Sequence, residues 1–448
     1  MASKSKSHSR VKDMISDLPD SLLCHILSFM PTKDSVSTSV LSSRWKRVWA
    51  SVPSLDFRET HSDSESFVLF VSRVLYFRNS SDIQKFKLKC YCVERFSHID
   101  GWIRTAIMHN LVELDLCVEK DASYMEDFRL ELPKSLFMCK TLVKLNLSSI
   151  FIINPPTSWC LPHLRVLFIT VKNPGSDLME NLLPGCPALE DFSIFGNVGE
   201  GYLNFNISAL ELKKLQISLY TRSEDDEFLD YNDFNIFVTS PKLEYFGLDQ
   251  STLSKCVLGN SESFVEASID LDCHIATEHP AFAGRVTPLM AQICNVKYLS
   301  LSAHDLHDNC ELPIFDNLKQ LKLVLHRCCS WWAEFLKRSP NLESLVLEHV
   351  GCNCDGLGGY GVKEEKLLWH HPELVPNCQL SHVKTICIKE FLGRDDEFEV
   401  AKYLLKNGEV LNSMNIYTGR DVVCTKEEML EKLLKFERVS KTCDVEIA

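Results

Sequence analysis

Residues 356–361, Gly-Leu-Gly-Gly-Tyr-Gly, match the G-x-G-x-x-G spacing of dinucleotide-binding loops. That chemistry needs the glycines directly between a strand and a helix N-terminus, where backbone amides face a pyrophosphate. Here five residues separate Val350 from Gly356, and Pro372 and Pro376 would interrupt a following helix. We therefore expect a connecting loop rather than a nucleotide site.

Cysteine and histidine side chains in the same region are of types that bind zinc. Their C-x-C and His-His spacings differ from the C-x₂₋₄-C and H-x₃₋₅-H pairs of common zinc sites. The chain also lacks the H-E-x-x-H, G-x-S-x-G and G-x₄-G-K-[ST] motifs of proteases, hydrolases and phosphate-binding loops. We predict no metal site, no cofactor and no catalytic residues, and we expect a non-catalytic protein. The zinc candidates set aside are Cys352, Cys354, His370, His371 and Cys378.

Composition narrows the classes of partner and compartment. A formal charge of −13 over 448 residues argues against a general nucleic-acid binder, because phosphate attraction needs a basic face. Residues 1–12 form a small basic tail, which we expect to be disordered rather than a nuclear address. No secretory h-region and no apolar run long enough for a membrane helix occurs. The 19 scattered cysteines fit reduced thiols, so we expect a cytoplasmic or nuclear protein.

Residues 17–49 predict three short helices. Pro19 fits the start of the first helix and Pro31 its end, and a second helix begins near Thr32. Trp45 and Trp49 lie one turn apart in the third. Helices this short cannot bury so much apolar surface among themselves, so we expect another surface to cover it. The stripe of the first helix consists of Leu18, Leu22, Leu23, Ile26, Leu27 and Met30.

A six-residue pattern, apolar-x-x-apolar-x-apolar, recurs from residue 83 onward. Most intervals between matches are 21 to 32 residues, which overlaps the leucine-rich-repeat period of about 20–29. Each unit is a short strand plus a return helix or loop, and stacking buries a continuous core. We therefore predict a parallel sheet curved into a horseshoe. The matches begin at residues 83, 111, 142, 164, 189, 212, 243, 264, 296, 318 and 342, and two more begin at 383 and 411.

Alternation along each strand places the fourth and sixth pattern positions in the core and the third, fifth and seventh on the concave face. Rigid aromatic rings among mixed polar groups suit protein recognition. Several of these residues also fit an ordinary solvated surface. Our candidate substrate-binding residues are Phe168, Phe195, Tyr245, Tyr298 and Lys322.

The head resembles an F-box over about 43 residues. The matching features include Leu18-Pro19, Leu22-Leu23, Ile26-Leu27, Pro31, Val40-Leu41-Ser42 and Arg44-Trp45. The resemblance implies docking onto a Skp-type adaptor and, through it, a cullin–RING ligase. The alternative is that the head packs on the repeats of its own chain. The residues we expect to bind the adaptor are Leu18, Pro19, Leu22, Leu23, Ile26, Leu27, Pro31, Val40, Leu41 and Trp45.

The C-terminal segment resembles the FBD domain of plant-type F-box/leucine-rich-repeat proteins. The matching features include Trp369, Val375-Pro376-Cys378, Ser381-His382-Val383-Lys384, Phe391-Leu392-Gly393 and Tyr403-Leu404-Leu405-Lys406-Asn407. Helices are expected at residues 397–407 and 426–436, beside the last two strand matches. Together these elements predict a small α/β cap.

The predicted fold class is α/β. A helical F-box precedes the repeat horseshoe, and an FBD-like cap follows it. The expected domains are a tail (1–12), the F-box (13–58), a linking helix (59–82), the repeats (83–360) and the FBD-like domain (361–448).

The predicted function is substrate recognition in a Skp–cullin–F-box ubiquitin ligase, with an unidentified target protein on the repeats and no membrane partner. Two alternatives are a small-molecule co-receptor, whose bound ligand completes the substrate interface, and an enzyme.

Overall fold

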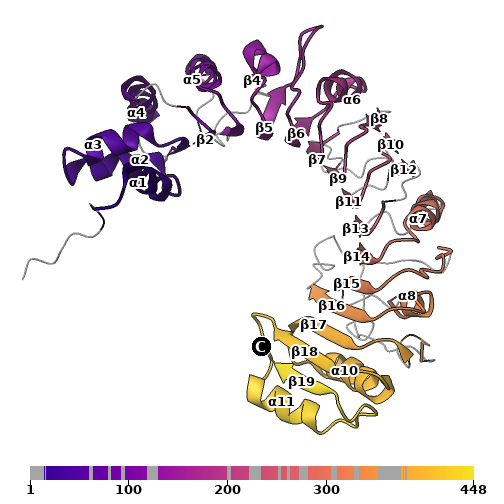
Figure 1. Ribbon diagram of the computed structural model, residues 1–448. Coiled ribbons are helices and arrows are strands. Elements are labelled where there is room, and N and C mark those ends of the chain that lie inside the picture. The colour runs from indigo at the N-terminus through magenta and orange to yellow at the C-terminus, as the bar shows by residue number, and fades with distance from the viewer. Residues whose placement is uncertain are drawn as a thin grey trace, which may run out of the picture. The chain divides into compact units, whose positions relative to one another are not determined.

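The computed structural model describes residues 15, 17–59, 64–78, 82–91, 96–118, 130–198, 203–220, 234–250, 254–259, 263–271, 281–303, 310–326, 332–350, 375–376, 378 and 381–447. Tertiary contacts divide the chain into two units, residues 1–167 and residues 168–448 (Figure 1). Each unit is built around a parallel sheet.

The first unit begins with the predicted helical head. Pro19 and Pro31 precede the first two helices with φ of −57° and −53°, near the value that the proline ring imposes. The core of the head consists of Leu23, Leu27, Trp45, Val48 and Val52. The elements are α1 (Asp20–Leu27), α2 (Thr32–Ser37), η1 (Thr38–Val40), α3 (Trp45–Val48) and η2 (Trp49–Ser51).

A parallel sheet in the order β1-β2-β3-β5 follows the head. The backbone N–H of Asp56 on β1 donates to Thr32 Oγ1 at 2.8 Å, so α2 satisfies a donor of the first strand. Strand β1 was not predicted. The strands are β1 (Ser54–Arg58), β2 (Lys85–Cys90), β3 (Glu113–Val118), β4 (Leu130–Glu131) and β5 (Lys144–Ile152). The helices are α4 (Ser64–Phe77), α5 (Phe96–Met108) and η3 (Lys134–Met138).

The second unit holds a longer parallel sheet with its strands in the order β6-β7-β9-β11-β13-β14-β15-β16-β17-β18-β19. Strand β6 (Val166–Lys172) spans the boundary between the two units. The others are β7 (Asp191–Asn197), β9 (Lys214–Tyr220), β11 (Tyr245–Gln250), β13 (Glu266–Leu271), β14 (Tyr298–Ala303), β15 (Gln320–His326), β16 (Ser344–Val350), β17 (Thr385–Phe391), β18 (Ser413–Thr418) and β19 (Asp444–Ile447).

Each of the thirteen pattern matches begins two residues before a strand. The first apolar residue therefore lies in a turn, and it is buried there, as for Leu189, Leu243 and Leu342. The N–H of each of these leucines donates to the carbonyl three residues earlier, at 3.1 to 3.3 Å. A proline at the second position of each turn supplies the φ that the turn needs. The pattern thus encodes a turn followed by a strand.

Several return segments are strands rather than the helices or loops we expected. Three of them form a second parallel sheet in the order β12-β10-β8, here called the back sheet, with β8 (Leu203–Ser208), β10 (Phe234–Thr239) and β12 (Lys255–Leu258). Other return segments are helical and lie on the same side of the main strands as the back sheet (Figure 1). These are α6 (Leu178–Leu182) with η4 (Leu183–Gly185), α7 (Ala281–Gln292) and α8 (Trp332–Lys337).

The C-terminal segment continues the same sheet, because β16, β17, β18 and β19 pair in parallel register. Helices α10 (Asp395–Asn407) and α11 (Lys426–Leu434) connect its strands and agree with the predicted helices. The buried Glu397 carboxylate accepts the N–H groups of Leu392 and Arg394 at 3.0 and 2.9 Å, which closes the N-terminus of α10. In the described part of the chain, no helix has the length and apolar character to cross a bilayer.

Candidate functional site

The exposed apolar side chains of the head form the first candidate surface. Leu22 and Ile26 lie one turn apart on α1 and are 48% and 45% exposed. Val40, at the end of η1, is 86% exposed, and Phe29 is 78% exposed. We call the exposed set the head face; it consists of Ile15, Pro19, Leu22, Ile26, Phe29, Val40 and Leu41.

The structure divides the ten residues predicted to bind the adaptor. Pro19, Leu22, Ile26, Val40 and Leu41 are exposed, whereas Leu18 and Pro31 are half-buried. The other three, Leu23, Leu27 and Trp45, are at most 5% exposed and belong to the core of the head. Helical spacing identified one apolar stripe, but some residues of this stripe lie in the core of the head and others lie on its exposed face. Ile15 and Phe29 were not in the predicted set, although Ile15 lies three residues before Leu18 and Phe29 three residues after Ile26.

Arg44 fixes the relative position of the helices that carry the head face. Its guanidinium donates to the Leu18 carbonyl oxygen, and its Nη2 lies 2.6 Å from Asp20 Oδ1. Ser35 Oγ donates to the Leu27 carbonyl at 3.1 Å and ties α2 to the end of α1. The Arg44 bonds join residues 24 and 26 positions apart and the Ser35 bond joins residues 8 positions apart, so the face is held by the head's own contacts.

The second candidate surface is the strand face, which carries the third, fifth and seventh pattern positions. Strand register aligns these positions into rows across the sheet. In one row, Glu266 lies between Tyr245 and Tyr298 on neighbouring strands. Tyr298 is 44% exposed, and Tyr245 is half-buried.

The other predicted substrate residues occupy separate places on the strand face. Phe195 is 42% exposed and packs edge-on against Tyr220, with ring centroids 5.9 Å apart. Phe168 is half-buried on β6. The Lys322 ammonium is engaged by Glu348 at 2.9 Å, so this residue is part of a surface ion pair.

Tyr245 is held by polar side chains of the two neighbouring strands, which were not among the five candidate substrate-binding residues. Its hydroxyl donates to Gln216 Oε1 at 3.0 Å and also hydrogen-bonds with Ser268. A Cβ at Gly247 would overlap Gln216 Oε1 and lie 2.8 Å from the Tyr245 hydroxyl. Burial raises the pKa of Tyr245, and the charges of Glu266 and Asp191 raise it further. The glycine within the strand pattern was the available signal, because it marks close approach of another group.

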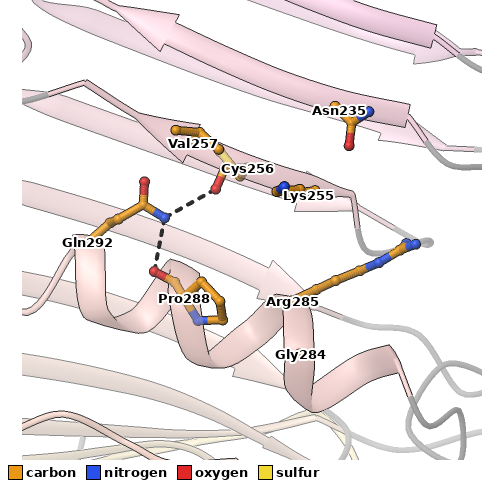
Figure 2. Close-up of a pocket in the computed structure, with 8 residues that line it drawn as sticks. All are labelled: Asn235, Lys255, Cys256, Val257, Gly284, Arg285, Pro288 and Gln292. Carbon is orange, nitrogen blue, oxygen red and sulfur yellow. Dashed lines mark hydrogen bonds between the residues drawn. The ribbon is translucent and has the colours of Figure 1, made fainter.

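A hollow of about 540 Å³ lies between the back sheet and α7 (Figure 2). One side of it is closed by Gln292, whose amide donates to the Cys256 carbonyl at 3.1 Å and accepts the Leu258 N–H at 2.6 Å. The side chain thereby takes the place of a neighbouring strand along β12. A ligand there would touch return segments, whereas a co-receptor ligand must touch the substrate face. The lining residues are Asn235, Lys255, Cys256, Val257, Gly284, Arg285, Pro288 and Gln292.

The nucleotide and zinc candidates fall mainly outside the described residues, which exclude 351–374. The described member, Cys378, is buried, and its Sγ donates to the Leu336 carbonyl at 3.2 Å. Within the described ranges, no three His, Cys, Asp or Glu side chains gather as metal ligands would.

Comparisons with known proteins match all three parts of the chain. An F-box domain model matches residues 15–57, a model of the LRR repeats of the FBD-associated F-box protein At5g56370 matches 99–254, and an FBD model matches 371–416. The F-box/LRR-repeat protein At4g14096 of Arabidopsis thaliana is 31% identical, covering 97% of this chain and 95% of the relative. The F-box/FBD/LRR-repeat protein At2g26030 of the same plant is 27% identical, covering 97% and 98%.

Proposed function

Because this chain belongs to the F-box/LRR-repeat family and carries an FBD, we propose that it is a substrate receptor of a Skp–cullin–F-box ubiquitin ligase. In this proposal the head face binds a Skp-type adaptor, and the strand face binds the target protein. The F-box implies the adaptor, and F-box/LRR proteins are in general non-catalytic adaptors. The receptor would act by proximity, because holding a target near the ubiquitin carrier raises its effective concentration.

The exposure of the head face is the observation that supports adaptor binding. Val40 and Leu41 retain 86% and 63% of their surface although Leu23 and Leu27, on the same small head, are almost fully buried. Large apolar side chains gathered on a surface mark an interaction site, because covering each one fully contributes about 1.5–3 kcal/mol. The head therefore has both a core of its own and a surface suited to a partner.

The test is capture of a purified Skp-type adaptor by the full chain. We expect Val40→Asp/Leu41→Asp to abolish capture, because two carboxylates would be buried without partners. A matched variant, Phe195→Asp/Tyr298→Asp, places the same charges on the strand face and should capture the adaptor normally. Equal capture by wild type and the Val40/Leu41 variant would contradict the proposal.

A further inference from the structure

One part of the strand face, over β7, β9, β11, β13 and β14, carries an excess of negative charge. Its side chains include the carboxylates of Asp191, Asp249, Glu266 and Asp270, but Lys214 supplies the one ammonium group in these described strands. Among the described residues, no ion pair joins Asp191, Asp249 or Glu266 to a base. Asp249 and Asp270 stand directly opposite each other on β11 and β13. Within the described ranges, Asp191, Asp249 and Glu266 therefore add no cross-strand ion pair that would stabilise the sheet.

Carboxylates elsewhere on the same pattern positions are matched. Glu113 on β3 lies 3.0 Å from the Lys85 ammonium on β2, and Glu348 on β16 lies 2.9 Å from that of Lys322. On these strands, cross-strand ion pairs between a carboxylate and an ammonium group stabilise the sheet. The β7–β14 region departs from it.

Aromatic rings lie among these carboxylates. Tyr298 and Phe195 are exposed, and Glu266 stands between Tyr245 and Tyr298 in one row. Tyr245 is fixed in place by Gln216 and Ser268, so its ring is ordered before a partner arrives. Ring faces attract Lys and Arg side chains, and Arg stacks on them while pairing with a carboxylate. A neutral partner gains only the ring contacts, and an acidic partner is repelled by the carboxylates.

We propose that the strand face of β7–β14 binds a basic segment of the target, in which Arg or Lys side chains pair with Glu266 and Asp249 and stack on Tyr298. The inference rests on the proposed receptor function and specifies the class of its target. Four strand spacings of about 4.8 Å span about 19 Å, which an extended segment crosses in about six residues. The segment is therefore short, and it can belong to a loop or a terminus.

The test uses two fluorescent peptides of about ten residues, one alternating Arg and Ser and the other alternating Glu and Ser, with affinity read by anisotropy at low and high salt. We expect the Arg peptide alone to bind, and added salt to weaken it. The variant Asp191→Asn/Asp249→Asn/Glu266→Gln should bind it about tenfold more weakly, the loss expected for three exposed charges. Tyr298→Ala should weaken binding roughly twofold to fivefold.

A charge-matched control separates local recognition from attraction to an acidic protein. Asp316→Asn/Glu409→Gln/Glu437→Gln neutralises three exposed acids outside the strands and should change affinity less than twofold. Equal losses in both triple variants, or equal binding of the Glu peptide, would overturn the proposal.

Adaptor capture by the same preparations distinguishes the two levels of inference. If capture is normal while the Arg peptide does not bind, the basic-segment proposal fails and the receptor proposal stands. If the wild-type chain fails to capture the adaptor, the receptor proposal itself is contradicted. Melting temperatures of the variants confirm folding, since each substitution is at an exposed or half-buried side chain.

Discussion

Adjacent leucines on α1 should separate adaptor binding from folding of the head. Leu22 and Ile26 are about half exposed, whereas Leu23 and Leu27 are 0% and 1% exposed. The two pairs have the same i, i+4 spacing on one helix. Leu22→Ala/Ile26→Ala therefore alters the surface, and Leu23→Ala/Leu27→Ala alters the core.

The expected magnitudes follow from burial. Fully covering a large apolar side chain is worth about 1.5–3 kcal/mol, so covering the exposed half of Leu22 and of Ile26 contributes about 1.5–3 kcal/mol together. That loss corresponds to a roughly 10- to 100-fold rise in the adaptor Kd. Replacing a buried leucine by alanine costs about 2–5 kcal/mol. The combined cost of replacing Leu23 and Leu27 should therefore exceed the free energy of unfolding of so small a head.

The assays are adaptor affinity by biolayer interferometry and hydrogen exchange of peptides covering residues 17–52. Exchange is chosen because it reports on the head alone, whereas a melt of the whole chain averages over all of its parts. We expect the surface pair to lose affinity with unchanged protection, and the core pair to lose protection as well. Unchanged affinity in the surface pair would refute the assignment of the head face. Unchanged protection in the core pair would refute the assignment of Leu23 and Leu27 to the core.

Two further predictions concern stability. The Lys319 and Lys384 ammonium groups lie 2.7 and 2.9 Å from the Glu343 carboxylate and lower the pKa of Glu343 to about 2 from the usual 4.5. The stabilisation from these two ion pairs is therefore present above pH 4.5 and is lost as pH falls through 2. The melting temperature of wild type should exceed that of Glu343→Gln near neutral pH, and the gap should vanish toward pH 2; a constant gap would contradict this cause. Glu397→Ala should lower the free energy of unfolding by about 1–3 kcal/mol and speed hydrogen exchange at Leu392 and Arg394, because their N–H groups lose a buried acceptor. The control Glu399→Ala, on the exposed side of α10, should have little effect.

The main strands were predictable because burial repeats with a fixed spacing. Leu114 and Leu116 are both buried on β3, and the same two positions are buried in repeat after repeat. The back sheet also had a signal, since Leu203, Phe205 and Ile207 alternate with polar residues and are buried. We missed it because the repeat pattern assigns return segments to helices or loops. Helix α7 was concealed by Pro288 inside it.

The surfaces were less predictable than the strands, because spacing identifies a helix stripe but not what covers each part of it. Leu22 and Leu23 have the same chemistry, and three-dimensional packing assigns one to the surface and the other to the core. On the strand face, alternation correctly exposed Phe195 and Tyr298. Alternation could not predict the ion pair of Lys322, because its partner Glu348 is 26 positions away on the next strand.

The two candidate surfaces differ in chemistry, and this difference suits their proposed partners. The head face is apolar, so its attraction for an adaptor should be nearly independent of salt and the same for every target. The β7–β14 part of the strand face is charged and aromatic, so it should discriminate among targets by charge and release them readily. A receptor benefits from this division, because it must remain on the ligase while successive targets exchange. Salt titration of the two interactions in one preparation should therefore weaken peptide binding well before adaptor binding.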